Sequence, residues 1–127
     1  MSDEATTVAH LRRQVAAFVA AREWEIYHTP RNLSVAIAIE AAELMEHFLW
    51  LSPEQAAAAM ENPRRRAAVV DELADVLIYA LSLANALGAD VSEAVQAKLA
   101  RNEQRFPPEE WRGRARGIDD ASTGPEG

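Results

Sequence analysis

The chain contains no cysteine, which excludes both a disulfide framework and a thiolate metal site. It has only five glycines, aromatic residues make up 6% of it, and β-branched residues occur in short runs. Alanine and leucine dominate instead, and this composition favours an all-α fold. A length of 127 residues suits one domain with a single hydrophobic core.

Long apolar runs and an excess of basic residues are also missing. No run approaches the roughly 20 apolar residues that span a bilayer. The N-terminal stretch 1–7 is polar and acidic, without the apolar centre of a signal peptide. We therefore expect a cytoplasmic protein with no membrane partner. The formal net charge of −7 argues against binding to a nucleic-acid polymer, which relies on basic surface.

Apolar periodicity and capping residues predict a bundle of four long helices with one short extra helix. Asn32, Ser52 and Asn62 are expected as N-caps, and Gly88 follows the last residue of a helix. The expected helices span residues 7–26, 33–49, 53–60, 63–87 and 91–105.

The polar ends of the chain are expected to lie outside this bundle. We expect residues 1–6 to be disordered and residues 7–107 to form the domain. Two prolines, Pro107 and Pro108, end the last helix, and residues 108–127 are rich in Gly, Pro, Arg, Asp and Ser. This composition predicts a flexible C-terminal tail.

Two acidic pairs, Glu40 with Glu43 and Glu72 with Asp75, lie near the middle of two predicted helices. Residues three apart share one helix face, so facing helices would gather four carboxylates. Either pair alone is typical of an ordinary solvated face. Glu40, however, falls at the centre of an apolar stripe, where an unpaired charge is costly. The combination predicts an oxygen-only site for Mg²⁺, with Mn²⁺ as the possible substitute.

A ferritin-like di-metal site is the obvious alternative, since it also takes carboxylates from facing helices. That site requires Glu-x-x-His on two helices. None of the histidines, His10, His28 and His47, follows a glutamate by three residues. The sequence therefore favours the magnesium-type site.

The last predicted helix carries one stripe that changes from apolar to basic. The stripe begins with Val91 and Val95 and continues through Lys98, Asn102 and Arg105. The two cations could be surface charges whose stems cover the core. Because they share a stripe with Asn102, we favour a contact with phosphate.

The helix expected over 33–49 is apolar nearly all round, because Val35, Ile39, Met45 and Leu49 lie away from its main apolar face. A four-helix protomer cannot cover such a helix from every side. The pattern therefore predicts a homo-oligomer.

Five segments of the chain form a distinctive set. They are Arg22-Glu23-Trp24-Glu25, His28-x-Pro30-Arg31-Asn32-Leu33, Glu40-x-x-Glu43-Leu44-x-Glu46-x-Phe48-x-Trp50, Asp71-Glu72-Leu73-Ala74-Asp75-Val76-Leu77-Ile78-Tyr79 and Lys98-x-x-x-Asn102-x-x-Arg105-Phe106-Pro107. Together they resemble the all-α, MazG-like nucleotide pyrophosphatases, and most of all their dCTP pyrophosphatase branch. The match covers residues 11–107.

The resemblance implies a magnesium-dependent hydrolase that converts a nucleoside triphosphate, such as dCTP or a modified dCTP, to the monophosphate and pyrophosphate. It implies a dimer or a dimer of dimers, and we favour the tetramer. The implied catalytic metal ligands are Glu40, Glu43, Glu72 and Asp75. Our own hypothesis is that Glu43 orients the water. The implied phosphate or sugar contacts are Tyr79, Lys98, Asn102 and Arg105. The implied nucleoside-binding residues are Trp24, His28, Asn32 and Trp50, with Arg31 in the same motif.

One position departs from the family pattern. Eukaryotic relatives in the cytosine-selective branch carry a histidine nine residues before the tryptophan, where this chain has Val15. One alternative is therefore a relative acting on dUTP or another phosphorylated nucleotide. The other is a non-catalytic helical oligomerisation module, in which the acidic residues only add solubilising charge.

Overall fold

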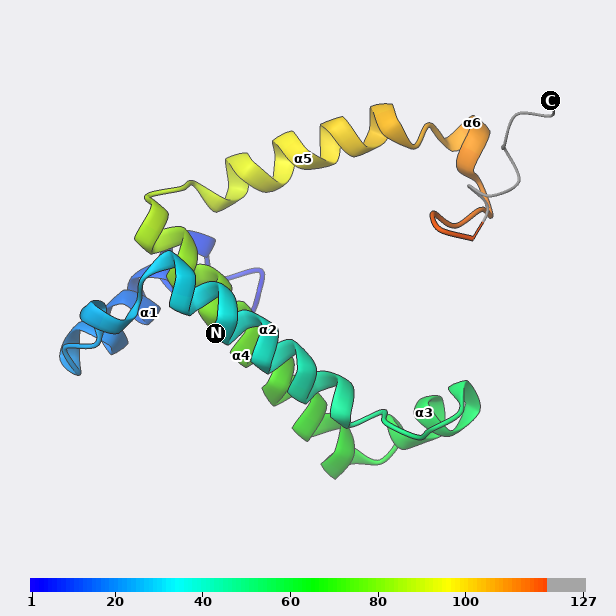
Figure 1. Ribbon diagram of the computed structural model, residues 1–127, viewed down its shortest axis with the longest axis horizontal. Helices are drawn as coiled ribbons and strands as arrows, with labels where there is room; N and C mark the ends of the chain where they lie inside the picture. Colours follow the sequence, from blue (N-terminus) through cyan, green and yellow to red (C-terminus); the bar gives the residue numbers. More distant parts are fainter. Residues whose placement is uncertain (119–127) are drawn as a thin grey trace. The chain divides into compact units, whose positions relative to one another are not determined.

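The computed structural model describes residues 1–118, and these are helical without any strand (Figure 1). The all-α prediction is confirmed. The chain forms two compact units, residues 1–91 and the part from Ser92 onward. The first unit contains α1 (Val8–Ala21), the 3₁₀ helix η1 (Glu25–Tyr27), α2 (Pro30–Glu46), α3 (Pro53–Ala59) and α4 (Pro63–Leu87); α5 (Val91–Arg105) and α6 (Pro108–Trp111) follow.

The first unit is built on the antiparallel pair α2 and α4, with α1 packed on α4 (Figure 1). Leu33 of α2 is only 2% exposed, and Val19 of α1 and Ala59 of α3 are also buried. This core is small, because many large apolar side chains of the described chain remain exposed. The α2–α4 pair is therefore the scaffold on which the acidic residues are placed.

Most predicted helix signals are confirmed. Ser52 and Gln55 form a reciprocal capping box at the start of α3, and Asn62 accepts hydrogen bonds from two backbone N–H groups of α4. Gly88 ends α4 in the left-handed region, with φ +63°. These local side chains and backbone preferences set where both helices begin and where α4 ends.

The first helix is shorter than predicted. It ends at Ala21, because Glu23 adopts φ +52° and the Trp24 N–H turns back to donate to the Val19 carbonyl at 3.2 Å. Residues 25–27 form η1 instead of a continued helix. After this turn, the Trp24 ring packs edge-to-face against Phe18 of α1.

The second helix begins and ends earlier than predicted. Thr29, and not Asn32, is the N-cap: its hydroxyl accepts from the Asn32 backbone N–H at 3.2 Å, and Pro30 occupies the first helical position. The helix ends at Glu46, after which Trp50 adopts φ +67°. The predicted N-cap was therefore wrong by about one helical turn.

The second unit, within its described part, consists of α5 and the segment that follows it. The ring of Phe106 meets the ring of Trp111 edge-to-face at 4.9 Å. The segment predicted as a flexible tail thus begins with the four-residue helix α6, and residues 119–127 of that segment lie outside the described residues. Among residues 1–118, no helix has the length and hydropathy to cross a bilayer.

Candidate active site

The acidic residues of α2 and α4 form a cluster in the middle of the helix pair. Glu40, Glu43 and Glu72 each bring one carboxylate oxygen to within 4.8 Å of the other two. The Oε2 atoms of Glu40 and Glu72 are buried and have no hydrogen-bond partner in the described chain. Buried, unpartnered carboxylate oxygens at this spacing fit a hard divalent cation, which takes oxygen ligands.

Asp75 completes the acidic surroundings. It lines a cavity of about 230 Å³ together with Glu40. Burial raises the pKa of Glu40 from 4.5 to about 7, and the nearby carboxylates of Glu43, Asp75 and Glu72 add to this rise. Without a cation, Glu40 therefore retains a proton up to near-neutral pH. The same cluster of negative charges attracts a divalent cation, whose binding would favour the ionised form of Glu40.

This pKa gives a prediction for the metal-free protein. Because the folded-state pKa of Glu40 lies above the unfolded value, protonation stabilises the fold below about pH 4.5, and this contribution disappears as the pH rises through about 7. The melting temperature in a chelator should therefore fall between about pH 5 and pH 8. Glu40→Gln should flatten this part of the profile, and an equally steep fall in that variant would contradict the assignment.

Aromatic side chains surround the same cavity. Trp24, His28 and Tyr79 all line it, and the Trp24 ring lies edge-to-face against Phe18 with the ring centroids 5.9 Å apart. Planar surfaces beside a carboxylate cluster can hold a ring-bearing ligand while the cluster binds its charged end.

Four residues that line this cavity were not predicted from the sequence as site residues: Phe18, Val19, Ile78 and Ser82. Ser82 is 5% exposed and its hydroxyl has no hydrogen-bond partner among the described residues. The signal was available, because Ser82 continues the stripe of Glu72, Asp75 and Tyr79 at helical spacing along α4. The sequence signal for Ser82 was therefore the recurrence of polar residues every three or four positions on one face of α4.

Three sequence-predicted residues of the first unit lie on the surface. Trp50 is 90% exposed. The Asn32 side chain is exposed and donates to the Tyr27 carbonyl at 3.0 Å, so it holds the start of α2. Arg31 is exposed beside it. None of these three side chains lines the cavity beside the acidic cluster.

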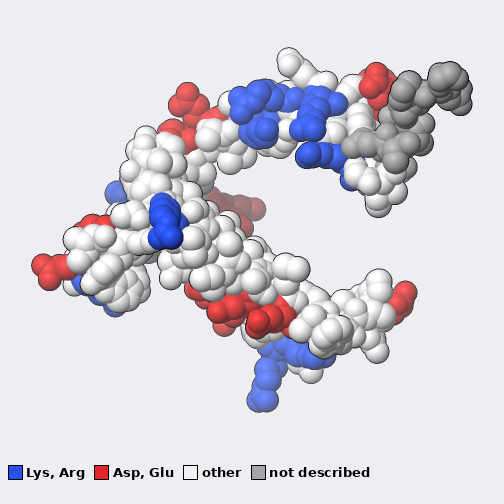
Figure 2. Space-filling model, viewed as in Figure 1, with Lys and Arg blue, Asp and Glu red and all other residues white. Residues whose placement is uncertain are grey.

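The predicted basic stripe forms a cavity of its own in the second unit. Lys98, Asn102 and Arg105 line a space of about 440 Å³. The remaining lining residues come from the segment after α5 and are Phe106, Trp111, Arg114 and Arg116. Figure 2 shows acidic side chains gathered on the α2–α4 pair and basic side chains gathered on α5 and beyond. The carboxylates suited to a metal and the cations suited to phosphate thus belong to different units.

The model of the MazG-like family matches residues 35–120. The chain belongs to the MazG-like family. This MazG-like chain is 41% identical over 109 residues to "dCTP pyrophosphatase 1" of Bos taurus, covering 86% of this chain and 64% of the bovine protein. The protein of the same name from Rattus norvegicus is 41% identical over 118 residues, covering 93% and 69%. The chain thus spans about two thirds of the length of these relatives.

Among solved structures, the MazG-like chain is similar to a pyrophosphatase from Archaeoglobus fulgidus. The TM-score is 0.75 at 38% identity, covering 84% of this chain and 98% of the archaeal one. A shorter match of 34 residues is 65% identical to a "dATP/dGTP diphosphohydrolase" of Cyanophage S-2L, covering 27% of this chain and 32% of the phage protein.

Proposed function

We propose that this MazG-like chain is a magnesium-dependent nucleoside triphosphate pyrophosphohydrolase. It cleaves a (deoxy)nucleotide such as dCTP between the α- and β-phosphates and yields the monophosphate and pyrophosphate. The observation that carries this proposal is the cluster of Glu40, Glu43 and Glu72 beside an aromatic-lined cavity. The names of the bovine, rat and archaeal relatives support the same reaction.

Glu40, Glu43, Glu72 and Asp75 would hold the magnesium ion, and manganese has the same ligand preference. The chemistry that such an ion supplies is neutralisation of phosphate charge and a lower pKa for a bound water. These four carboxylates fit a magnesium ion, because one buried oxygen of Glu40 and one of Glu72 have no hydrogen-bond partner among the described residues.

The reaction itself is a displacement at the α-phosphorus. Glu43 orients the attacking water and accepts its proton as the new oxygen–phosphorus bond forms. The bond from the α-phosphorus to the bridging oxygen breaks, and its electron pair leaves with pyrophosphate. Lys98 and Arg105 stabilise the negative charge on that leaving group, while Asn102 hydrogen-bonds to phosphate oxygens. Trp24, His28 and Tyr79 hold the nucleoside and exclude water around it.

We also propose that a second copy of the chain covers the exposed apolar faces of the first unit. Ile39 on α2 is 53% exposed, and Val35 one turn before it and Leu77 on α4 are similarly open. Apolar faces of this extent on a protomer with a small core are typical of a subunit interface. The favoured assembly is a dimer of dimers.

Product analysis tests the proposed reaction directly. With magnesium and a panel of nucleoside triphosphates, we expect pyrophosphate and the monophosphate in equal amounts, and little product in a chelator. The measurement is chromatography of the nucleotides together with separate assays of pyrophosphate and orthophosphate. Release of orthophosphate as the first product would rule out attack at the α-phosphorus.

A second candidate substrate class is favoured by the short phage match, whose name specifies dATP and dGTP. The panel therefore includes purine nucleotides beside dCTP and dUTP.

The non-catalytic alternative is tested by thermal melting. A binding enzyme gains stability from magnesium and nucleotide by mass action, whereas a purely structural module melts at the same temperature with and without them.

A further inference from the structure

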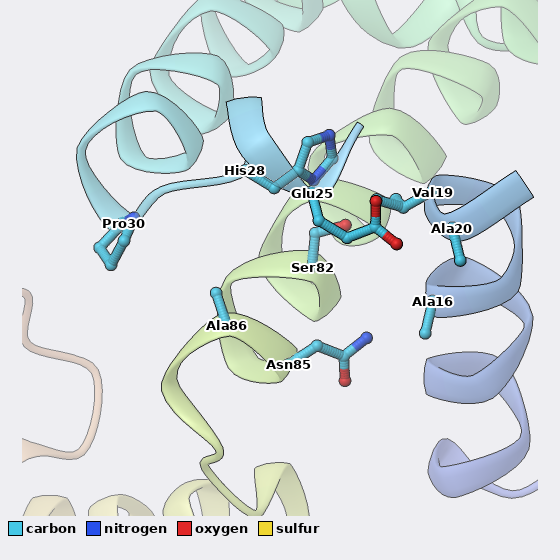
Figure 3. A pocket seen from close by; sticks show the side chains of 9 residues that line it. All are labelled: Ala16, Val19, Ala20, Glu25, His28, Pro30, Ser82, Asn85 and Ala86. Atoms are coloured by element: carbon cyan, nitrogen blue, oxygen red, sulfur yellow. The ribbon is translucent and has the colours of Figure 1, made fainter. Parts of the chain in front are cut away.

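The second unit contains a cavity that shares no lining residue with the acidic site. It measures about 440 Å³, and basic and aromatic side chains line it. A cavity of about 470 Å³ between α1, η1 and the end of α4 (Figure 3) differs in this respect, because Val19, His28 and Ser82 also line the cavity beside the acidic cluster. The basic cavity is therefore a separate binding space, and the proposed reaction uses only its α5 side.

The segment after α5 supplies the other side of this cavity. The rings of Phe106 and Trp111 meet at 4.9 Å with an angle of 84° between their planes. Gly113 then adopts φ +73°, a left-handed conformation that suits glycine, and the Arg114 N–H donates to the Trp111 carbonyl at 2.9 Å. The chain therefore turns directly after α6, and Arg114 and Arg116 line the same cavity as the cations of α5.

Two of the four cations lie against aromatic rings. The Arg105 Cζ atom is 5.1 Å from the centre of the Phe106 ring, and the Arg114 Cζ atom is 5.8 Å from the centre of the Trp111 ring. A guanidinium over a ring keeps the N–H groups at its edge, and these match the oxygens of a phosphate. Because the rings restrict the rotamers of both arginines, less conformational entropy is lost when an anion binds.

The other two cations, Lys98 and Arg116, are available to a ligand. Their side chains form no hydrogen bond or ion pair within residues 1–118. Lys98 also lies about two helical turns before Arg105 on α5, which is roughly 10 Å along the axis. A single phosphate group does not span that distance. The cavity therefore suits an anion of two or more linked phosphates better than orthophosphate.

We propose that Arg114 and Arg116, from the segment after α5, are further phosphate-binding residues of this protein. Together with Lys98 and Arg105, they surround the β- and γ-phosphates of a nucleoside triphosphate and then the pyrophosphate product. The inference rests on the proposed pyrophosphohydrolase function and extends it to the segment 108–118. This segment is then a working part of the enzyme, although its composition is that of a tail.

Binding of inorganic pyrophosphate in magnesium-free buffer tests the cavity without turnover and without a cation at the acidic cluster. Calorimetry gives the dissociation constant. All four cations are exposed, so water screens each contact. Arg114→Gln and Arg116→Gln should therefore each weaken binding about fivefold, and the double substitution about 25-fold. Arg116→Lys keeps the charge and should bind within about twofold of the wild-type protein.

Arg112→Gln is the matched control, because Arg112 belongs to the same segment and is exposed but does not line the cavity. Its affinity for pyrophosphate should equal that of the wild-type protein. An equal loss in Arg112→Gln would show attraction by overall charge only and would overturn the site. Wild-type affinity in the double variant, or no binding by the wild-type protein, would overturn it as well.

The fold of the segment is checked in the same variants. Arg114 also donates to the Glu110 carbonyl at 3.2 Å, so its substitution can disturb α6. Arg116 has no such contact, and Arg116→Gln with an unchanged melting temperature decides the assignment. Absence of pyrophosphate release from every triphosphate would refute the proposed reaction instead, and pyrophosphate binding would still decide whether Arg114 and Arg116 form an anion site.

Discussion

Glu40→Gln is expected to lower turnover by about 1,000-fold or more while the protein stays folded. Glutamine keeps the size of the side chain but removes the charge from the centre of the cluster, where Glu43 and Glu72 lie within 4.8 Å. A single metal ligand of a phosphoryl-transfer site typically controls several kcal/mol of transition-state stabilisation, and each ~1.4 kcal/mol is tenfold in rate. The measurement is kcat for pyrophosphate release over a range of magnesium concentrations.

The folded state must be checked in the same samples. Circular dichroism and the melting temperature in a chelator should show an intact helical protein, because the neutral amide that replaces the Glu40 carboxylate does not repel Asp75. The stabilisation by added magnesium should be lost together with turnover. Glu46→Gln on the same helix is the matched control, since Glu46 is exposed and should retain full activity. Full activity of Glu40→Gln would falsify the metal-site assignment.

Val35→Glu combined with Ile39→Glu is expected to convert the assembled protein to monomers. The two side chains lie one turn apart on the exposed face of α2. In a two-fold interface each substitution acts twice. Four apolar side chains at about 1.5 kcal/mol each would raise the dissociation constant on the order of 10⁴-fold. Light scattering coupled to size-exclusion chromatography gives the mass of each species.

The matched control for the assembly is a double substitution of similar chemistry on an exposed polar surface. Arg64→Glu with Arg65→Glu on the first turn of α4 changes charge without removing an apolar side chain, and the assembly should persist. A wild-type protein of monomeric mass at micromolar concentration would contradict the proposed interface. Monomers that melt well below the wild-type temperature would agree with a protomer whose own core is small.

The helices and the carboxylate cluster could be predicted because they depend on local signals. Ser52 and Asn62 cap helices through their own side chains, and the spacing of Glu40 with Glu43 puts both on one face of α2. Antiparallel pairing of two helices with acids near their middle then suffices to bring the acids together. The clustering of Glu40, Glu43 and Glu72 is present in the structure.

The end of α1 and the start of α2 depend on backbone geometry that the residue types alone do not encode. Glu23 adopts φ +52°, a conformation that few non-glycine residues take, so the early end of α1 could not be predicted from periodicity. Pro30 disfavours helix at Thr29, and for this reason the helix was predicted to start later, with Asn32 as its cap. The same Thr-Pro pair is equally typical of an N-cap followed by a proline at the first helical position, and this is the arrangement that α2 adopts.

Three proposed site residues, Glu72, Asp75 and Tyr79, lie on the unbroken helix α4. At about 1.5 Å of rise per residue, Glu72 and Tyr79 are separated by about 10 Å along the axis. A helix of this length resists compression, so the distance between the proposed metal ligands and Tyr79 is constant. A ligand that contacts both must therefore span that distance, and α4 would select ligands by length as well as by chemistry.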